Sequence, residues 1–228
     1  MAAPVTFTTR DGGVSDGAYA ELNLGRHVGD AEASVAQNRR RLAARLGVER
    51  VVFMRQVHGR AVAVVDDGTQ DDVGGVDALV SVSPGVALGV LVADCVPILV
   101  VGARGAAAVH AGRRGVHADV VGAAIEQLRA LDAGRLRAYI GPAICGRCYE
   151  VPAAMQTDVV ADVPETHSTT RRDTPALDLK AGVAAQLRRA GVAHITVDPA
   201  CTAEDPRYFS HRRDGVTGRF AGVAVVGS

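Results

Sequence analysis

GVALGVLVADCVPILVVGA, residues Gly85 to Ala103, is a long apolar run interrupted by one aspartate and one proline. It is long and apolar enough to suggest a membrane span, but Asp94 and Pro97 lie near its centre. A central Asp costs about 2.5 to 3.5 kcal/mol on membrane insertion, so we expect no span here. The Val-rich halves on either side of DCVP are instead typical of two buried strands joined by a short turn. Asp94 and Cys95, placed side by side at that turn, therefore need partners.

Other short Val-rich runs bounded by Gly, Pro or Asp surround this segment. The predicted strands are Val5 to Thr8, Val51 to Arg55, Ala61 to Val65, Ala78 to Val82, Gly89 to Ala93, Ile98 to Val101, Ala106 to Val109, Leu136 to Ile140, a strand around Ile195, and Ala221 to Val226. The predicted helices are residues 31–47, with Asp30 as N-cap and Gly47 as stop, then Ala118 to Leu131, and stretches near Pro152 to Ala161 and Leu177 to Ala190.

Strands gathered in the middle, with helices mostly outside them, predict an α+β domain in layers rather than a regular βαβ repeat. Neither a low-complexity tract nor a Pro/Ser-rich linker divides the chain, so residues 1–228 are expected to form a single domain. No GxGxxG motif follows a strand and opens a helix, so a dinucleotide-binding fold has no support.

The charge balance excludes some partners. Lys plus Arg equals Asp plus Glu at 25 each, so the chain has no global field to hold nucleic acid or anionic lipid. The first residues offer no basic region followed by an apolar one, so we expect no secretory signal and a cytoplasmic location.

Histidines and a cysteine stand at predicted strand ends. These are His58 in FMRQVHG, His110 in AAVHAGRRG and His211 in FSHRRDG, while Cys95 follows the strand Gly89 to Ala93. If His58, Cys95 and His110 converge at one edge of a sheet, they suit zinc with a fourth position open for catalysis. The other interpretation is three unrelated packing residues.

The remaining cysteines predict no metal site. Cys145 and Cys148 form a CxxC motif without a second such pair, which a zinc ribbon would need. A cytoplasmic compartment favours reduced thiols over disulfides. We therefore interpret Cys145 and Cys148 as packing residues in a tight turn.

Several motifs, in order from residue 8 to residue 226, together resemble one family. They are TTRDGGVSDGAYAELNLGRHVGD, QVHG, DALVSVSPGVALGVLVADCVPILV, AAVHAGRRG, YIGPAICGRCYEV, LDL and CTAEDPRYFSHRRDGVTGRFA. The resemblance is to the YfiH-like family, also called the laccase-domain or polyphenol oxidase family, whose members are now regarded as purine nucleoside phosphorylases.

This resemblance implies an α/β fold of layered sheets and helices, similar to the catalytic domain of cytotoxic necrotizing factor. It implies a zinc ion held by His58, Cys95 and His110. Asp94 would not bind the zinc itself but would orient one of its ligands or a basic side chain. The sequence departs from the commoner pattern AGWRG, because Arg113 replaces the tryptophan.

The implied activity is phosphorolysis of adenosine, inosine and methylthioadenosine, with adenosine deaminase activity. Phosphate needs arginine partners, for which Arg10, Arg212 and Arg213 are the candidates. Asn23 is the candidate reader of a ribose hydroxyl or the base.

Other functions stay open at this point. One is a copper-dependent polyphenol oxidase, although the chain has only seven histidines for a multicopper site. Another is a cysteine hydrolase that uses Cys95 as nucleophile and His110 as base. A non-enzymatic role in metal storage is the last.

Overall fold

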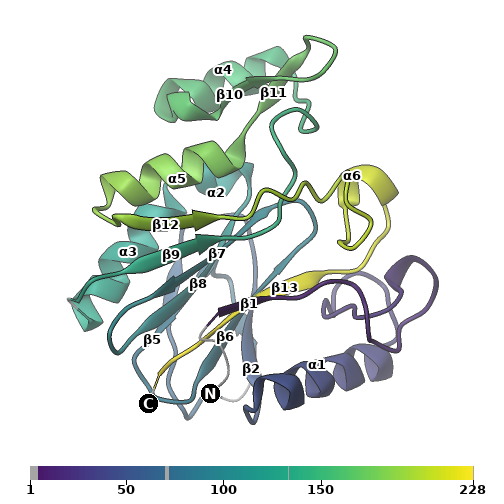
Figure 1. Cartoon of the computed structure of the whole chain (residues 1–228), viewed down its shortest axis with the longest axis vertical. Helices are drawn as coiled ribbons and strands as arrows, with labels where there is room; N and C mark the ends of the chain where they lie inside the picture. The colour runs from purple at the N-terminus through teal and green to yellow at the C-terminus, as the bar shows by residue number, and fades with distance from the viewer. Residues whose placement is uncertain (1–4, 70–71, 133, 228) are drawn as a thin grey trace.

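The computed structural model describes residues 5–69, 72–132 and 134–227 and builds them around two β-sheets (Figure 1). The five-stranded sheet has the order β1-β13-β6-β2-β4, and the six-stranded sheet has the order β12-β9-β7-β8-β5-β3. The strands are β1 (Val5–Phe7), β2 (Val51–Arg55), β3 (Val62–Val64), β4 (Val73–Gly74), β5 (Ala78–Ser81), β6 (Ala87–Val92), β7 (Val96–Val101), β8 (Ala106–Ala111), β9 (Arg137–Ile140), β10 (His167–Thr169), β11 (Pro175–Leu177), β12 (His194–Val197) and β13 (Phe220–Val225).

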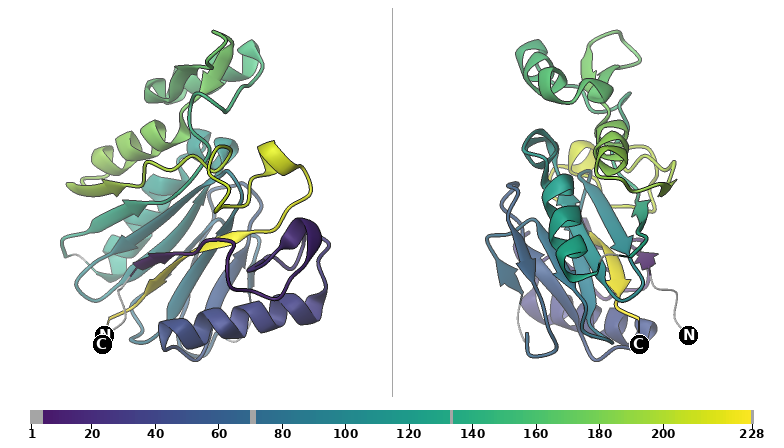
Figure 2. Two further views of the ribbon diagram at one scale, coloured as in Figure 1. Left: turned by 45° about the vertical axis from the view of Figure 1, so that its right-hand side comes forward. Right: turned by 90° about the vertical axis from the view of Figure 1, so that its left-hand side faces the viewer.

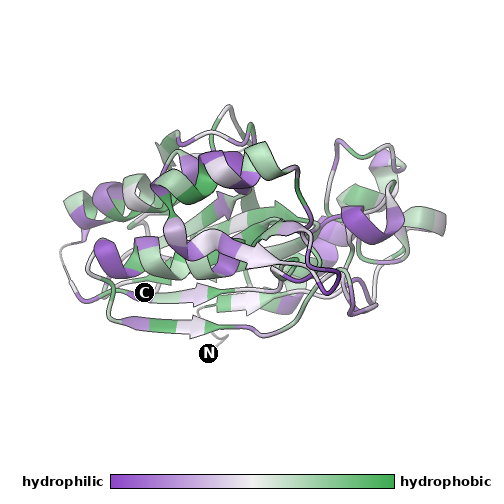
Figure 3. Cartoon of the chain, turned by 90° about the horizontal axis from the view of Figure 1, so that it is seen from above, coloured by the Kyte–Doolittle hydropathy of each residue, from purple (hydrophilic) through white to green (hydrophobic). Residues whose placement is uncertain are grey.

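The helices lie outside the two sheets (Figure 1). They are α1 (Glu32–Leu46), α2 (Arg113–His117), α3 (Val120–Leu131), α4 (Ala153–Asp162), α5 (Leu179–Arg189) and α6 (His211–Asp214), with short 3-10 helices at Gly17–Tyr19 and Pro164–Thr166. Hydrophilic and hydrophobic residues alternate along their ribbons, as in helices that bury one face (Figure 3). Helix α4 and the β10–β11 hairpin project beyond α5 in each ribbon view (Figures 1 and 2).

The side chains of β7 show why the molecule is layered. Leu99 packs between the sheets with Leu88 of β6, whereas Ile98 and Val100 face the opposite way, toward α3 and α5. On the far side, Leu42 of α1 packs on the outer face of the five-stranded sheet. Both faces of each sheet are therefore buried, which accounts for the near-continuous apolar runs in the sequence.

The predicted layered α+β class is confirmed, while the similarity to cytotoxic necrotizing factor stays a prediction. The two Val-rich halves of the central segment do form strands, β6 and β7, but each begins two residues earlier than predicted and they belong to different sheets. The turn that carries Asp94 and Cys95 is thus the crossing from one sheet to the other.

Several local predictions were wrong or incomplete. The N-cap of α1 is Ala31, because the carboxylate of Asp30 accepts hydrogen bonds from Ser15 and Asn23. Gly47 ends α1 in the left-handed conformation as predicted, with φ 68°. The short elements β4, α2, α6 and the β10–β11 hairpin were not predicted. No helix of the described residues has both the length and the apolar character to cross a bilayer.

Candidate active site

His58, Cys95 and His110 come together at one end of the two sheets. Cys95 lies in the crossing between β6 and β7, His58 lies three residues after β2, and His110 lies within β8 rather than after it. The Cys95 sulfur and one ring nitrogen from each histidine all lie within 4.8 Å of one another. The two imidazole rings meet edge to face, with centroids 4.7 Å apart. Three such donors could hold a metal ion.

A buried carboxylate that the sequence analysis missed holds both histidines. Asp77, directly before β5, has no exposed surface, and its Oδ1 lies 2.8 Å from Nδ1 of His110. The backbone N–H groups of Val57, His58 and Gly59 also donate to this carboxylate. Because Nδ1 of His110 is engaged, its Nε2 is left free to face Cys95. The signal in the sequence was an acidic residue opening an apolar strand, VDALV.

Gly112 leaves the room that a metal ion would occupy. A Cβ at this position would lie 2.8 Å from Cδ2 of His58, 3.1 Å from the Cys95 sulfur and 3.6 Å from Cε1 of His110. Its φ of −77° is ordinary, so the glycine is needed for space and not for conformation. The three donors and this hollow beside them fit a metal ion.

The same geometry changes the acidity of the Cys95 thiol in the metal-free protein. Burial alone raises the pKa of Cys95, but the adjacent His110 and His58 overcome this effect and lower it to about 6. In turn, burial lowers the pKa of His110, whereas the Cys95 thiolate and Asp77 together raise it to about 9. Both shifts, the lowered pKa of Cys95 and the raised pKa of His110, favour a thiolate beside an imidazolium in the metal-free protein.

Asp94, the predicted supporting carboxylate, ties the C-terminal loop to the site. Its φ is 91°, its Oδ1 accepts a hydrogen bond from the hydroxyl of Thr202 at 2.6 Å, and its Oδ2 accepts one from the backbone N–H of Arg212 at 2.6 Å. Asp94 thus positions a segment that carries an arginine. Orientation of a metal ligand by Asp94 stays a prediction.

A pocket of about 150 Å³ opens beside Cys95. Its lining includes Asp94, Tyr149, Leu179, His211 and Arg212. Ligand pockets usually measure about 300 to 1,000 Å³, so this one would enclose only part of a nucleoside-sized molecule. His211 reaches it from the start of α6 and not from a strand end, which corrects the sequence prediction.

Tyr149 gives the pocket an aromatic face. The guanidinium carbon of Arg212 lies 5.2 Å from the centroid of its ring. Burial and the nearby Cys95 raise the pKa of Tyr149, and Arg113 lies beside the same side chain and partly opposes that rise. The pocket therefore has an aromatic ring although Arg113 replaces the tryptophan of the commoner pattern.

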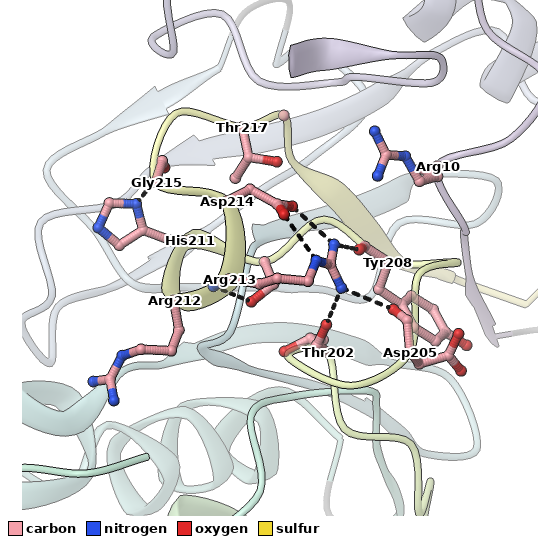
Figure 4. Close-up of polar contacts among 12 residues, drawn as sticks. Arg10, Thr202, Asp205, Tyr208, His211, Arg212, Arg213, Asp214, Gly215 and Thr217 are labelled. Carbon is pink, nitrogen blue, oxygen red and sulfur yellow. Dashed lines mark hydrogen bonds and ion pairs between the residues drawn. The ribbon is translucent and has the colours of Figure 1, made fainter. Parts of the chain in front are cut away.

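The structure assigns Arg213 a structural role. Its Nε and Nη2 donate to Asp214, and Nη1 and Nη2 donate to the carbonyl oxygens of Thr202, Asp205 and Tyr208 (Figure 4). A guanidinium has five N–H donors, and all of them are used here. Phosphate binding by Arg213 therefore stays a prediction, and it would require some of these hydrogen bonds to break.

Arg212 and Arg10 keep free donors, but only Arg212 lines the pocket. Arg212 donates to the carbonyl oxygens of Cys148 at 3.2 Å and Glu150 at 3.1 Å, and its other three N–H groups have no acceptor among the described residues. Arg10 donates through Nε to the carbonyl of Ala20. Arg10 and Arg212 point to opposite sides of the Arg213–Asp214 pair (Figure 4).

Arg219 is a basic residue near the site that the sequence analysis missed. Burial lowers its pKa, and Cys95 and Asp94 lie close enough to oppose that effect. Its Nη1 donates to the carbonyl oxygens of Thr217 and Gly218, so three N–H groups remain for another acceptor.

Asn23 cannot serve as the predicted reader of the substrate without breaking the loop that it holds. It has no exposed surface. Its amide nitrogen donates to Gly25 and Asp30, and its oxygen accepts from the N–H groups of Gly25 and Arg219. All four of its hydrogen-bonding positions are filled, so substrate reading by Asn23 stays a prediction that would require one of these bonds to break.

The comparisons with known proteins agree with this arrangement. The family model described as "Multi-copper polyphenol oxidoreductase laccase" matches residues 4–227. A Mycobacterium tuberculosis protein named purine nucleoside phosphorylase is 51% identical over 222 residues, covering 95% of this chain and 89% of its own. Purine nucleoside phosphorylase YlmD of Geobacillus stearothermophilus is 39% identical over 246 residues, covering 97% and 88%.

Solved structures share the whole fold. The crystal structure of YlmD from Geobacillus stearothermophilus matches with a TM-score of 0.89 at 37% identity, covering 99% of this chain and 93% of that one. The hypothetical protein YfiH of Bacillus licheniformis matches with a TM-score of 0.90 at 29% identity, covering 97% and 92%. On the family model, the relatives and the fold, this chain belongs to the YfiH family of laccase-domain proteins.

Proposed function

We propose that this chain is a zinc-dependent purine nucleoside phosphorylase that also deaminates adenosine. Its substrates would be adenosine, inosine or S-methyl-5′-thioadenosine with phosphate, and its products the base and the corresponding ribose 1-phosphate. The names of its relatives support this reaction. The observation that carries the proposal is the convergence of His58, Cys95 and His110 beside a pocket with an aromatic ring and an arginine. We further propose that residues 1–228 act as one catalytic domain in the cytoplasm.

Phosphorolysis requires an anion to be held beside C1′ of the ribose while the purine leaves. Arg212 and Arg219 each offer three free N–H donors near Cys95, and we assign phosphate binding to them. Tyr149 offers a ring face for the purine. When bound by His58 and its two partner ligands, zinc supplies a fixed positive charge that polarises a neighbouring oxygen or water molecule.

Copper is the alternative metal, because thiolate and imidazole ligands also bind it and the family model is described by a copper oxidase. We favour zinc and nucleosides over copper and phenols. Arg212 in the pocket lining suits an anionic co-substrate such as phosphate better than a neutral phenol.

A cysteine hydrolase is the second candidate, since a specific arrangement favours it. Cys95, His110 and Asp77 stand in the order nucleophile, base and orienting carboxylate, and the pKa of Cys95 is lowered to about 6. A substitution of His58 distinguishes the metal-dependent phosphorylase from the cysteine hydrolase. A metal site needs it as a ligand, whereas the triad of Cys95, His110 and Asp77 remains complete without it.

One experiment tests both candidates. Wild type and His58→Ala are given adenosine with and without phosphate, and with and without a chelator, and the products are separated by chromatography. We expect wild type to form adenine only with phosphate and inosine without it, and we expect chelation or His58→Ala to stop both. If an amide substrate is cleaved by His58→Ala and by chelated wild type, and neither adenine nor inosine forms, the hydrolase replaces the phosphorylase.

A further inference from the structure

A second group of possible ligands lies outside the active site. The sulfur atoms of Cys145, Cys148 and Cys201 and a carboxylate oxygen of Glu204 all lie within 4.8 Å of one another. Cys145 and Cys148 follow β9, and Cys201 and Glu204 follow β12. Since β9 and β12 pair in parallel, their carboxyl ends deliver both loops to the same edge of the sheet.

We propose that Cys145, Cys148, Cys201 and Glu204 form a second metal site that takes a thiophilic divalent cation, with zinc as the natural occupant. The sequence alone predicts packing cysteines here, because the CxxC motif has no second pair nearby. The fold supplies the missing ligands from Cys201, 56 residues after Cys145, and from Glu204. This inference does not depend on the proposed function.

The geometry of the cluster fits a closed tetrahedral site. Zinc–sulfur bonds of about 2.3 Å place sulfur atoms about 3.8 Å apart, within the 4.8 Å limit of the cluster. Cys201 is buried, and the backbone N–H of Cys145 points at its sulfur from 3.3 Å. Such an N–H group stabilises a thiolate by a charge-assisted hydrogen bond.

The surrounding charges also suit a bound cation. Three thiolates and a carboxylate around a dication leave a net negative charge on the site, which a nearby arginine partly balances. Arg171 forms an ion pair with Glu204, and its Nη1 lies 3.6 Å from the Cys148 sulfur. Without a cation, burial and the hydrogen bonds with Cys145 and Glu204 raise the pKa of Cys148 to about 12. This raised pKa opposes formation of the thiolate, but a bound dication overcomes it, because a thiol that coordinates a metal ion is deprotonated outright.

A metal ion here would join two loops that hydrogen-bond to the lining of the active-site pocket. The carbonyl oxygen of Cys148 accepts a hydrogen bond from Arg212, and Thr202, next to Cys201, donates to Asp94. Lys180 of α5 fixes the segment before Cys201 through the carbonyl oxygens of residues 198 and 200. The second site is therefore expected to be structural and to hold Arg212 in place.

Metal content per chain tests the proposal. Wild type purified in the presence of zinc acetate should carry about two zinc ions per chain, one at the open His58 site and one at the closed site of three thiolates and a carboxylate. Cys148→Ser and His58→Ala should each carry about one, and the double variant none. A wild type with one zinc ion that Cys148→Ser retains in full would overturn the second site.

A spectroscopic measurement keeps the proposal testable if Cys148→Ser fails to fold. In His58→Ala loaded with cobalt chloride, the three-thiolate site should give intense sulfur-to-cobalt charge-transfer absorption, which falls in His58→Ala/Glu204→Gln. Absence of this absorption in folded His58→Ala would refute the site. So would a thiol titration of denatured, metal-free wild type that finds two thiols fewer than the four cysteines of the sequence, since a disulfide then uses them.

Discussion

Replacing Asp77 by Asn tests the support of the proposed zinc site most directly. The two oxygens of Asp77 accept from four donors: Oδ1 from His110 and the His58 N–H, and Oδ2 from the Val57 and Gly59 N–H groups. Asn keeps the shape but exchanges one oxygen for an NH₂ group. Whichever way the amide lies, at least one pair of donors loses its acceptor.

The two orientations of the new amide have different consequences. If NH₂ replaces Oδ2, the N–H groups of Val57 and Gly59 are left unpaired, at about 1 to 3 kcal/mol each. If NH₂ replaces Oδ1, it donates to Nδ1 of His110 and moves the imidazole proton to Nε2, which can then no longer bind a metal. Loss of such outer partners typically lowers metal affinity about 10- to 100-fold. We therefore expect Asp77→Asn to lose stability, zinc affinity or both.

The assay measures zinc retained against graded concentrations of a competing chelator, beside urea unfolding of the metal-free protein. Asp132→Asn is the matched control, because Asp132 is equally buried and accepts N–H groups of Arg104 and Gly105 far from the ligands. It should lose stability while its zinc retention at the His58 site is unchanged. An Asp77→Asn protein with wild-type stability and wild-type zinc affinity would refute the assigned role of Asp77.

Three further predictions concern the same region. Gly112→Ala should fold, because φ is −77°, but should retain zinc about tenfold less well, as competition with a chelator would reveal. In metal-free protein, the rate of alkylation of Cys95 should have its midpoint near pH 6, and His110→Ala should move that midpoint upward. Because folding lowers the pKa of Cys95, the stability that the thiolate contributes should be lost as the pH falls through about 6. Arg212→Ala should raise the KM for phosphate about tenfold without changing the urea midpoint, whereas Arg213→Ala should lower the free energy of unfolding by about 1 to 3 kcal/mol and leave the phosphate KM closer to wild type.

The layered fold was predictable because the sequence carries its main cause, apolar runs interrupted by Gly, Pro and Asp. The partition of strands between two sheets was not. Leu88 and Leu99 both face the space between the sheets, yet nothing in their local sequence says that β6 and β7 separate at Asp94. That separation depends on pairing with distant strands, such as β13, and local patterns do not encode long-range pairing.

The three proposed zinc ligands could be predicted because each residue type has a specific chemistry and lies at or within three residues of a strand end. Arg213 and Asn23 could not be judged in the same way. An arginine suits phosphate by composition, but its availability depends on whether neighbouring carbonyl groups already use its N–H donors, and for Arg213 they use all of them. The role of Gly112 could not be predicted from the sequence for a related reason, because it depends on the space that the glycine leaves beside the three donors.

The two clusters together show what a search for short cysteine motifs leaves out. A CxxC motif that lacks a second pair nearby predicts no zinc when ligands are sought only in short motifs. Parallel pairing of β9 with β12 places Cys201 against Cys145 as closely as a second motif would. The active site arises in the same way, with His58, Cys95 and His110 delivered by strands of two different sheets. In a fold of this kind, the number of residues between two metal ligands is set by how far apart their strands lie in the sequence. A cysteine at a strand end therefore needs to be compared with the residues at every other strand end before it is interpreted as a packing residue.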